Sequence, residues 1–284
     1  MSKPAPMRKV VRSQTATRLK KLDAELGHAG RKPKDADAIH DLRVSIRRLS
    51  RELRVFEAWF EAGRVKNIRR RLRKLMEHCA AVRNCDVAIE VLRTAKCRNP
   101  ALFAALEEER RRTRRVLAGK LANWLRRNRV RKWRARLRVA RPAGGAELRT
   151  TSQENARRLL PAMIGELFRA GREAARPDSS HRKLHQFRLK TKRVRYTVEL
   201  FEQVYGGKTK PMMASLKGLQ EKLGAINDCA TTLEMIRRNR GAVTVVRRLA
   251  GERAAEFRSY WKKHFGPAER VRWKAVLSAA DGKK

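Results

Sequence analysis

Apolar residues recur at helical spacing in one stretch of this chain. The apolar positions from residue 39 onward step by three and four: Ile39, Leu42, Ile46, Leu49, Leu53, Phe56 and Phe60. That spacing places them along one side of an α-helix, where they can pack in a bundle. Strand-like alternation of apolar and polar residues is almost absent from the sequence. We therefore expect an all-α protein.

The same stretch has a second copy further along the chain. At a shift of 145 residues, segment 39–60 aligns with segment 184–205, and the identical pairs are His40/His185, Arg43/Arg188, Arg48/Arg193, Phe56/Phe201 and Glu57/Glu202. A further match, of residues 72–92 with 216–236, follows at a shift of 144. Because these matches continue along nearly the whole chain, the sequence predicts an internal repeat.

The repeat predicts how the chain is organised. Each half has about six helical segments, and the two halves join near residues 141–149, which read RPAGGAELR. Two helical bundles related by approximate two-fold pseudosymmetry are the natural architecture. We expect a single domain over residues 1–284, with a first half at 1–145 and a second half at 146–284.

A large excess of positive charge limits the possible partners. Lysine and arginine number 72 against 28 for aspartate and glutamate, which gives a formal charge of +44. Such an imbalance destabilises a compact fold through self-repulsion unless anions lie close by. Nucleic acid, an anionic membrane surface and inorganic polyphosphate all qualify as partners, and net charge alone does not choose among them.

Neither an export signal nor a membrane span is apparent. The basic N-terminal stretch lacks the apolar segment that follows the charges of a secretory signal. Charged residues interrupt every apolar run before it reaches the roughly 18 residues of a transmembrane helix. We therefore expect a soluble, cytoplasmic protein with no membrane partner.

The polar side of the helix over residues 39–56 carries a stripe of basic residues. At about 100° of turn per residue, four arginines fall within roughly 60° of His40 on the helix surface. They are Arg43, Arg47, Arg51 and Arg54. The apolar positions lie on the far side of the helix, so bundle packing leaves this stripe facing solvent or a cleft.

The second copy repeats the geometry of the stripe. Its members are His185, Arg188, Lys192 and Tyr196, flanked by Arg193 and Arg195. Both stripes turn acidic toward their ends, for example at Glu57 and Glu202. The predicted site is therefore confined to the first part of each helix.

The chemistry of the two stripes suits a linear polyanion. Cations recur every ~5–6 Å along such a helix face. An arginine fork can hold two phosphate oxygens, lysine supplies a compact charge, and histidine donates an N–H. A basic helix face can also be merely solvated, and a histidine can be purely structural. Two copies in phase favour a binding site, because the core positions differ among apolar types while His and Arg recur.

At these residues the sequence resembles the CHAD family, the conserved histidine α-helical domain. The main mark is H-x-x-R followed four residues later by Arg or Lys, as in HDLRVSIR from His40 and HQFRLKTK from His185. The later stretches CAAVRNCDV and LGAINDCA are similar to the family's L-G-x-x-R-D-x-D and L-G-x-x-N-D elements, with departures at Cys79, Ala80, Asn84 and Ala230. The departures concern local helix packing more than the basic stripes.

The resemblance implies an all-helical protein of two four-helix-bundle halves that binds inorganic polyphosphate through a basic surface. It also implies association with polyphosphate granules. Arg73 and Lys217, which match across the repeat, would extend the surface from the neighbouring helix. Some members carry a CYTH triphosphatase domain with an E-x-E-x-K motif. That motif is absent here, so we expect a stand-alone CHAD protein.

Other chemistry is poorly supported by the sequence. YGGKTK at 205–210 ends like a phosphate-binding loop, but Glu202 occupies the place of the required first glycine, so we expect a turn that ends a helix. His181 and His185 have the spacing of a zinc pair, yet no further ligand lies nearby in the sequence. With no paired carboxylates or Ser-His-Asp pattern, we expect no cofactor, metal site, catalytic residue or enzyme activity.

Sequence-independent binding of RNA or DNA is the alternative function. Phosphate contacts alone can drive it, but single-strand binders usually add aromatic stacking platforms. Most aromatic residues here, such as Phe56 and Phe187, fall in apolar phase, and among the aromatics only Tyr196 lies on a stripe. The stripes therefore suit phosphates without bases, with nucleic acid as a non-specific competitor.

Overall fold

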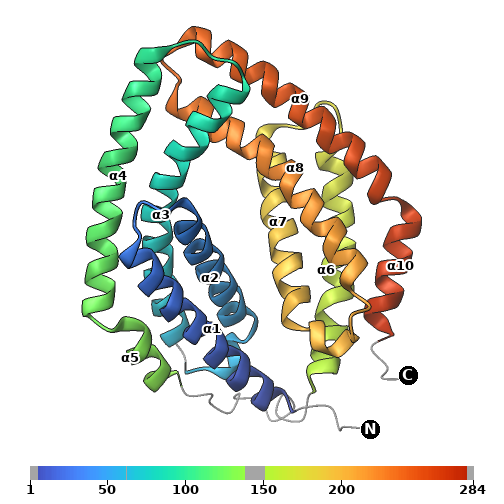
Figure 1. Cartoon of the computed structure of the whole chain (residues 1–284). Coiled ribbons are helices and arrows are strands. Elements are labelled where there is room, and N and C mark those ends of the chain that lie inside the picture. Colours follow the sequence, from blue (N-terminus) through green and yellow to red (C-terminus); the bar gives the residue numbers. More distant parts are fainter. Residues whose placement is uncertain (1–5, 62, 138–150, 280–284) are drawn as a thin grey trace. The chain divides into compact units, whose positions relative to one another are not determined.

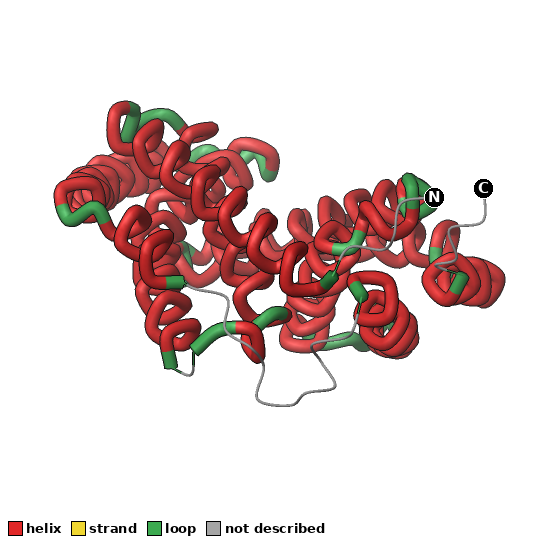
Figure 2. The backbone as a smooth tube through the Cα atoms, turned by 90° about the horizontal axis from the view of Figure 1, so that it is seen from below, coloured by secondary structure: helices red, strands yellow, loops and turns green. Residues whose placement is uncertain are grey.

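A computed structural model describes residues 6–61, 63–137 and 151–279. Helices make up the regular secondary structure of these residues (Figure 2). Pro6 and Thr151 form an isolated β-bridge. The expectation of an all-α protein is confirmed. The predicted join at residues 141–149, and with it the boundary between residues 145 and 146, lies outside the described residues.

The helices divide into two compact units (Figure 1). The first unit comprises residues 1–89 and 99–151, and the second comprises residues 90–98 and 152–284. The helices of the first unit are α1 (Met7–Arg31), α2 (Ala36–Val55), the 3₁₀ helix η1 (Glu57–Trp59), α3 (Arg64–Thr94), α4 (Pro100–Arg126) and α5 (Arg129–Arg136). The last residues of α3, from residue 90, are assigned to the second unit.

The second unit has the same order of elements. They are α6 (Ser152–Ala174), α7 (His181–Leu200), the 3₁₀ helix η3 (Glu202–Tyr205), α8 (Lys210–Met235), α9 (Arg240–His264) and α10 (Pro267–Ser278). In the described parts of both units, four long helices are followed by a shorter fifth one. This common order is what the predicted internal repeat requires. Pro161 lies inside α6.

The two stripe-bearing helices begin at side-chain caps. The carboxylate of Asp35 accepts hydrogen bonds from the backbone N–H groups of Asp37 and Ala38 at the start of α2. These two bonds lower the pKa of Asp35. The hydroxyl of Ser180 accepts from the N–H of Lys183 at the start of α7. Each cap satisfies backbone donors that a helix start leaves unpaired, and so fixes where the helix begins.

The predicted apolar stripe of α2 forms part of the core of the first unit. Its members are all buried, with Leu42, Leu49 and Leu53 fully inaccessible to solvent. Burial of each such side chain contributes roughly 1.5–3 kcal/mol to folding. In α7, Thr191 takes the place of Ile46 and is also buried, and its hydroxyl donates to the carbonyl of Phe187 at 3.0 Å.

One acidic side chain interrupts the apolar contact between α1 and α2. Glu52 of α2 is completely buried, accepts a hydrogen bond from the Thr15 hydroxyl at 2.8 Å, and lies 3.4 Å from Nε of Arg18. Burial raises the pKa of Glu52 to about 7, although both partners favour its charged form. Ionised Glu52 is therefore a local weakness in the helix pair.

We predict that Glu52→Gln stabilises the protein at pH 8. The pKa of Glu52 is higher in the folded chain than in the unfolded chain. The protonated carboxyl therefore contributes its full stability below the ordinary pKa of 4.5, and this contribution is lost as pH rises through about 7. The amide oxygen can still accept from Thr15. The gain in the free energy of unfolding should be about 2–3 kcal/mol at pH 8 and should vanish near pH 4.5.

Thermal or urea unfolding of both chains at pH 4.5, 6 and 8 measures this effect. Glu108→Gln, on the exposed face of α4, is the control and should show no such pH-dependent gain. A Glu52→Gln protein less stable than the parent at pH 8 would contradict the prediction.

Candidate functional site

The five stripe residues of the first unit lie along α2. His40 and Arg54 are exposed, whereas Arg43, Arg47 and Arg51 are half-buried. The half-buried arginines lie between the core and solvent, where their aliphatic stems can pack while the guanidinium groups stay near water. The polar side of α2 is therefore a partly enclosed face.

Arg43 connects α2 to α3. Its Nη1 donates to the backbone carbonyl of Cys79 at 3.3 Å, and its own carbonyl accepts from Nε of Arg47 at 3.2 Å. Arg43 is thus partly committed to holding the two helices together. Arg47, four residues further along α2, lies over a cleft between these helices.

This α2–α3 cleft has a volume of about 240 Å³. Three of its lining side chains are arginines, namely Arg47 from α2 and Arg69 and Arg73 from α3. The other lining residues are Ile46, Ser50, Leu72 and Met76. Two predicted site residues, Arg47 and Arg73, are therefore brought together with Arg69, which the sequence analysis did not include.

Like charges crowd one another around the cleft. The pKa of Arg69 is lowered, chiefly by burial and then by the positive charges of Arg54 and Arg73, while Glu57 opposes the shift. Arginine stays protonated even so, because its ordinary pKa is far above neutral. The repulsion is a cost that an anion placed between these arginines would remove.

His40 lies in a similarly positive environment at the other end of α2. Partial removal from water is the largest cause that lowers its pKa, and the charges of Arg47, Arg83 and Arg43 add to it, while Asp41 acts in the opposite direction. His40 is therefore mostly neutral at pH 7 in the free protein. In that state it can donate one N–H, and a bound anion would favour its protonation.

In the second unit, His185 of α7 has a polar partner in α8. Its Nδ1 lies 3.0 Å from Oδ1 of Asn227, which requires the proton on Nδ1 for a hydrogen bond. The Asn227 amide nitrogen in turn donates to the Thr231 hydroxyl at 3.5 Å. This arrangement leaves Nε2 of the exposed ring directed away from Asn227 and without a hydrogen bond to it.

The other predicted residues of the second unit differ in exposure. Arg193 and Lys217 are exposed, whereas Arg188, Lys192 and Arg195 are half-buried. Of these, Lys217 belongs to α8 and the rest to α7.

The structure corrects the expected place of Tyr196. Its ring is 7% exposed, and the two residues that follow it, Thr197 and Val198, are fully buried. The guanidinium carbon of Arg195 lies 4.9 Å from the centre of the ring. Three consecutive buried residues mean that α7 is enclosed at this point, so Tyr196 supports Arg195 by a cation–π contact and offers no open stacking surface.

The two units are not equivalent in charge. At the repeat shifts of 144 and 145 residues, Met213 corresponds to Arg69 and Glu199 to Arg54. The partner of the histidine changes in the same way, from Arg83 near His40 to Asn227 at His185. The two units therefore place their positive charges differently, because α7 carries cations such as Arg182, Lys190 and Arg195 where α2 has Asp37, Ser45 and Ser50.

The candidate zinc pair and the YGGKTK stretch both lie within the described residues. They contain no group of three His, Cys, Asp or Glu side chains placed to hold a metal ion, and the rings of His181 and His185 are 6.5 Å apart. The YGGKTK stretch forms the expected turn after a helix, with positive φ values of 53° at Gly206 and 84° at Gly207. No helix in the described ranges is long and apolar enough to cross a membrane.

Comparison with known proteins places the chain in a family. The family model of the CHAD domain matches residues 13–237. The chain belongs to the CHAD family. The resemblance that the two histidine motifs indicate is thereby confirmed.

Solved structures support the same fold for this CHAD chain. The crystal structure of the CHAD domain from the plant Ricinus communis is 20% identical, with a TM-score of 0.66 over 98% of this chain and 94% of the other. PptA from Streptomyces chartreusis is 15% identical, with a TM-score of 0.59 over 96% and 99%. A comparison with curated proteins finds no match.

Proposed function

We propose that this CHAD protein binds inorganic polyphosphate through its α2–α3 and α7–α8 faces. The observation that carries the proposal is the α2–α3 cleft, where Arg47, Arg69 and Arg73 converge and none of the described lining residues is acidic. A phosphate chain offers charge at short, regular intervals and can contact several arginines at once. Membership of the CHAD family supports the same ligand.

Binding without catalysis is the activity that we assign to these faces. Polyphosphate association would bring the protein to intracellular polyphosphate granules. The enclosed ring of Tyr196 supports a ligand made of phosphates over one that presents bases, because stacking on a base requires an open aromatic face.

Removing cations from the cleft should weaken binding of long-chain polyphosphate. We predict that Arg47→Gln/Arg73→Gln lowers the affinity at least about tenfold, which corresponds to about 1.4 kcal/mol. Arg188→Gln/Lys192→Gln tests the second unit in the same way. Arg43 is left unchanged because it also bonds to the Cys79 carbonyl. Fluorescence anisotropy with labelled polyphosphate measures the affinities.

A charge-matched control separates specific contacts from net charge. Arg111 and Arg112 of α4 are exposed and pair with Glu108 and Glu109 on their own helix. Arg111→Gln/Arg112→Gln should bind nearly as the parent does. The plot of log affinity against log salt concentration should also be less steep for the cleft variant. With the value for single-stranded nucleic acid, its slope changes by about 0.7 for each phosphate contact that is lost. Equal losses in both double variants would argue against a cleft site.

Polyphosphate should raise the pKa of His40. Its pKa is low in the free chain because of partial burial and nearby arginines, and a bound anion offsets both effects. Affinity should therefore increase as pH falls through the range between the free and bound pKa values, with proton uptake on binding. NMR titration of His40 with and without polyphosphate measures the shift. His40→Gln should reduce the pH dependence of binding, and an unchanged pKa would contradict the assignment.

A further inference from the structure

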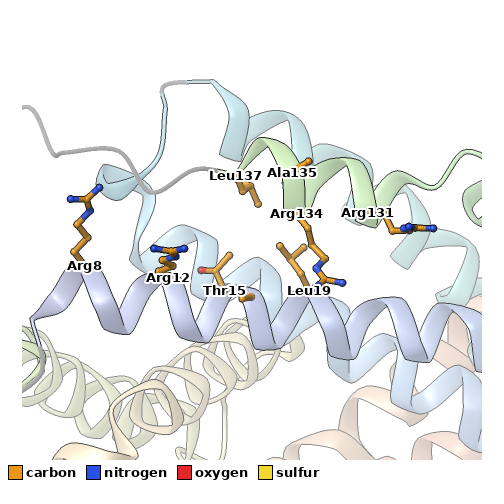
Figure 3. A pocket seen from close by; sticks show the side chains of 9 residues that line it. Arg8, Arg12, Thr15, Leu19, Arg131, Arg134, Ala135 and Leu137 are labelled. Atoms are coloured by element: carbon orange, nitrogen blue, oxygen red, sulfur yellow. The ribbon is translucent and has the colours of Figure 1, made fainter.

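A second basic groove lies between α1 and α5, apart from the α2–α3 cleft. It has a volume of about 870 Å³ and lies wholly among helices of the first unit (Figure 3). Arg8 and Arg12 rise from α1, while Arg134 extends from α5 toward α1 and Arg131 projects sideways from α5 (Figure 3). The groove therefore has cations on both of its walls.

The four groove arginines differ from the arginines of an ordinary solvated helix. On α4, Arg111 and Arg112 pair with glutamates three residues earlier. Within the described ranges, no ion pair joins any of the groove arginines to a carboxylate. All four are exposed. Their charges are thus available to a ligand.

The base of the groove is formed by short or apolar side chains. Thr15 and Leu19 of α1 are buried there, and Leu137, just after α5, is half-buried. The Thr15 hydroxyl is already bonded to Glu52, which also lies beside Arg18. The carboxylate of Glu52 is therefore covered by Thr15 and partly neutralised by Arg18.

The matched helices of the second unit are packed together instead. Trp273 of α10 is 2% exposed and makes an edge contact with Phe168 of α6 at 5.5 Å between ring centres. Leu277 lies four residues after Trp273, as Leu137 lies four residues after Trp133. Leu277 is fully buried, and its carbonyl accepts a hydrogen bond from the Tyr205 hydroxyl at 3.2 Å. An open groove at this place is therefore not a requirement of the fold.

We infer that the α1–α5 groove binds a short chain of phosphates, either free inorganic oligophosphate or the phosphate chain of a nucleoside triphosphate. Two facing walls of cations suit a narrow ligand with several negative charges. This site is separate from the polyphosphate-binding faces proposed above.

Calorimetric titration of the full chain with tripolyphosphate tests the inference. All titrations use the Arg47→Gln/Arg73→Gln background, in which the cleft contributes least. Adding Arg12→Gln/Arg134→Gln should lower the affinity about tenfold or more, whereas adding Arg111→Gln/Arg112→Gln should leave it unchanged. Absence of tripolyphosphate binding in this background, or an equal loss with both additions, would overturn the inference.

A second variant guards against indirect effects of removing arginines. Ala16 lines the groove and is exposed, so Ala16→Glu adds a negative charge to the α1 wall while every arginine stays in place. It should cause a similar loss in affinity for tripolyphosphate, and unchanged affinity would count against the groove. Circular dichroism and melting temperature confirm that each variant is folded.

Titration with ATP distinguishes the two sources of the phosphate chain. Affinity no greater than that of tripolyphosphate identifies the free oligophosphate as the ligand, and clearly tighter, groove-dependent binding identifies the nucleotide. Binding of ATP without any binding of tripolyphosphate would contradict recognition of phosphates. The proposed function is tested by the binding of long-chain polyphosphate to the Arg47→Gln/Arg73→Gln variant without further changes. The groove is tested with tripolyphosphate, so the two proposals can fail separately.

Discussion

Packing of the apolar side of α2 determines where the positive charges of the first unit lie. Leu42, Leu49 and Leu53 are completely buried, which turns the opposite side of the helix toward α3 and solvent. The bond from Arg43 to the Cys79 carbonyl then holds α2 at a fixed register against α3. Arg47 is consequently held opposite Arg73 and Arg69, at the cost of mutual repulsion. The apolar contacts of the fold thus sustain a cleft whose arginines repel one another, a cost that an anion placed among them would reduce.

Much of this arrangement could be predicted from the sequence, because it follows from helical periodicity. The apolar stripe of α2 is buried in the core, as its spacing predicts. The two histidines lie in the first turns of α2 and α7, which both begin at side-chain caps. Arg69 escapes a prediction based on the repeat because its counterpart in the second unit is Met213, whereas Arg73 is matched by Lys217. The position of Arg69 four residues before Arg73 places both on one face of α3, and that spacing was an available signal.

Other features depend on tertiary packing and leave no periodic signal. Tyr196 falls within the angular sector of the stripe, yet neighbouring elements enclose α7 at that point and the ring is buried. The α1–α5 groove depends on how closely two helices approach. Trp133 of α5 and Trp273 of α10 do not reveal that approach, because both are largely buried. Leu137 is nevertheless half-buried, whereas Leu277 is fully buried. The two units therefore share one order of helices while differing in charge and packing.

Competition between polyanions tests the central claim most directly. Labelled long-chain polyphosphate is bound to the full chain at physiological salt and then challenged with duplex DNA or RNA at an equal concentration of phosphate. A surface that recognises a bare phosphate chain should retain the polyphosphate, with little displacement by either nucleic acid. Displacement by DNA or RNA at equal phosphate would contradict the account and would favour sequence-independent nucleic-acid binding.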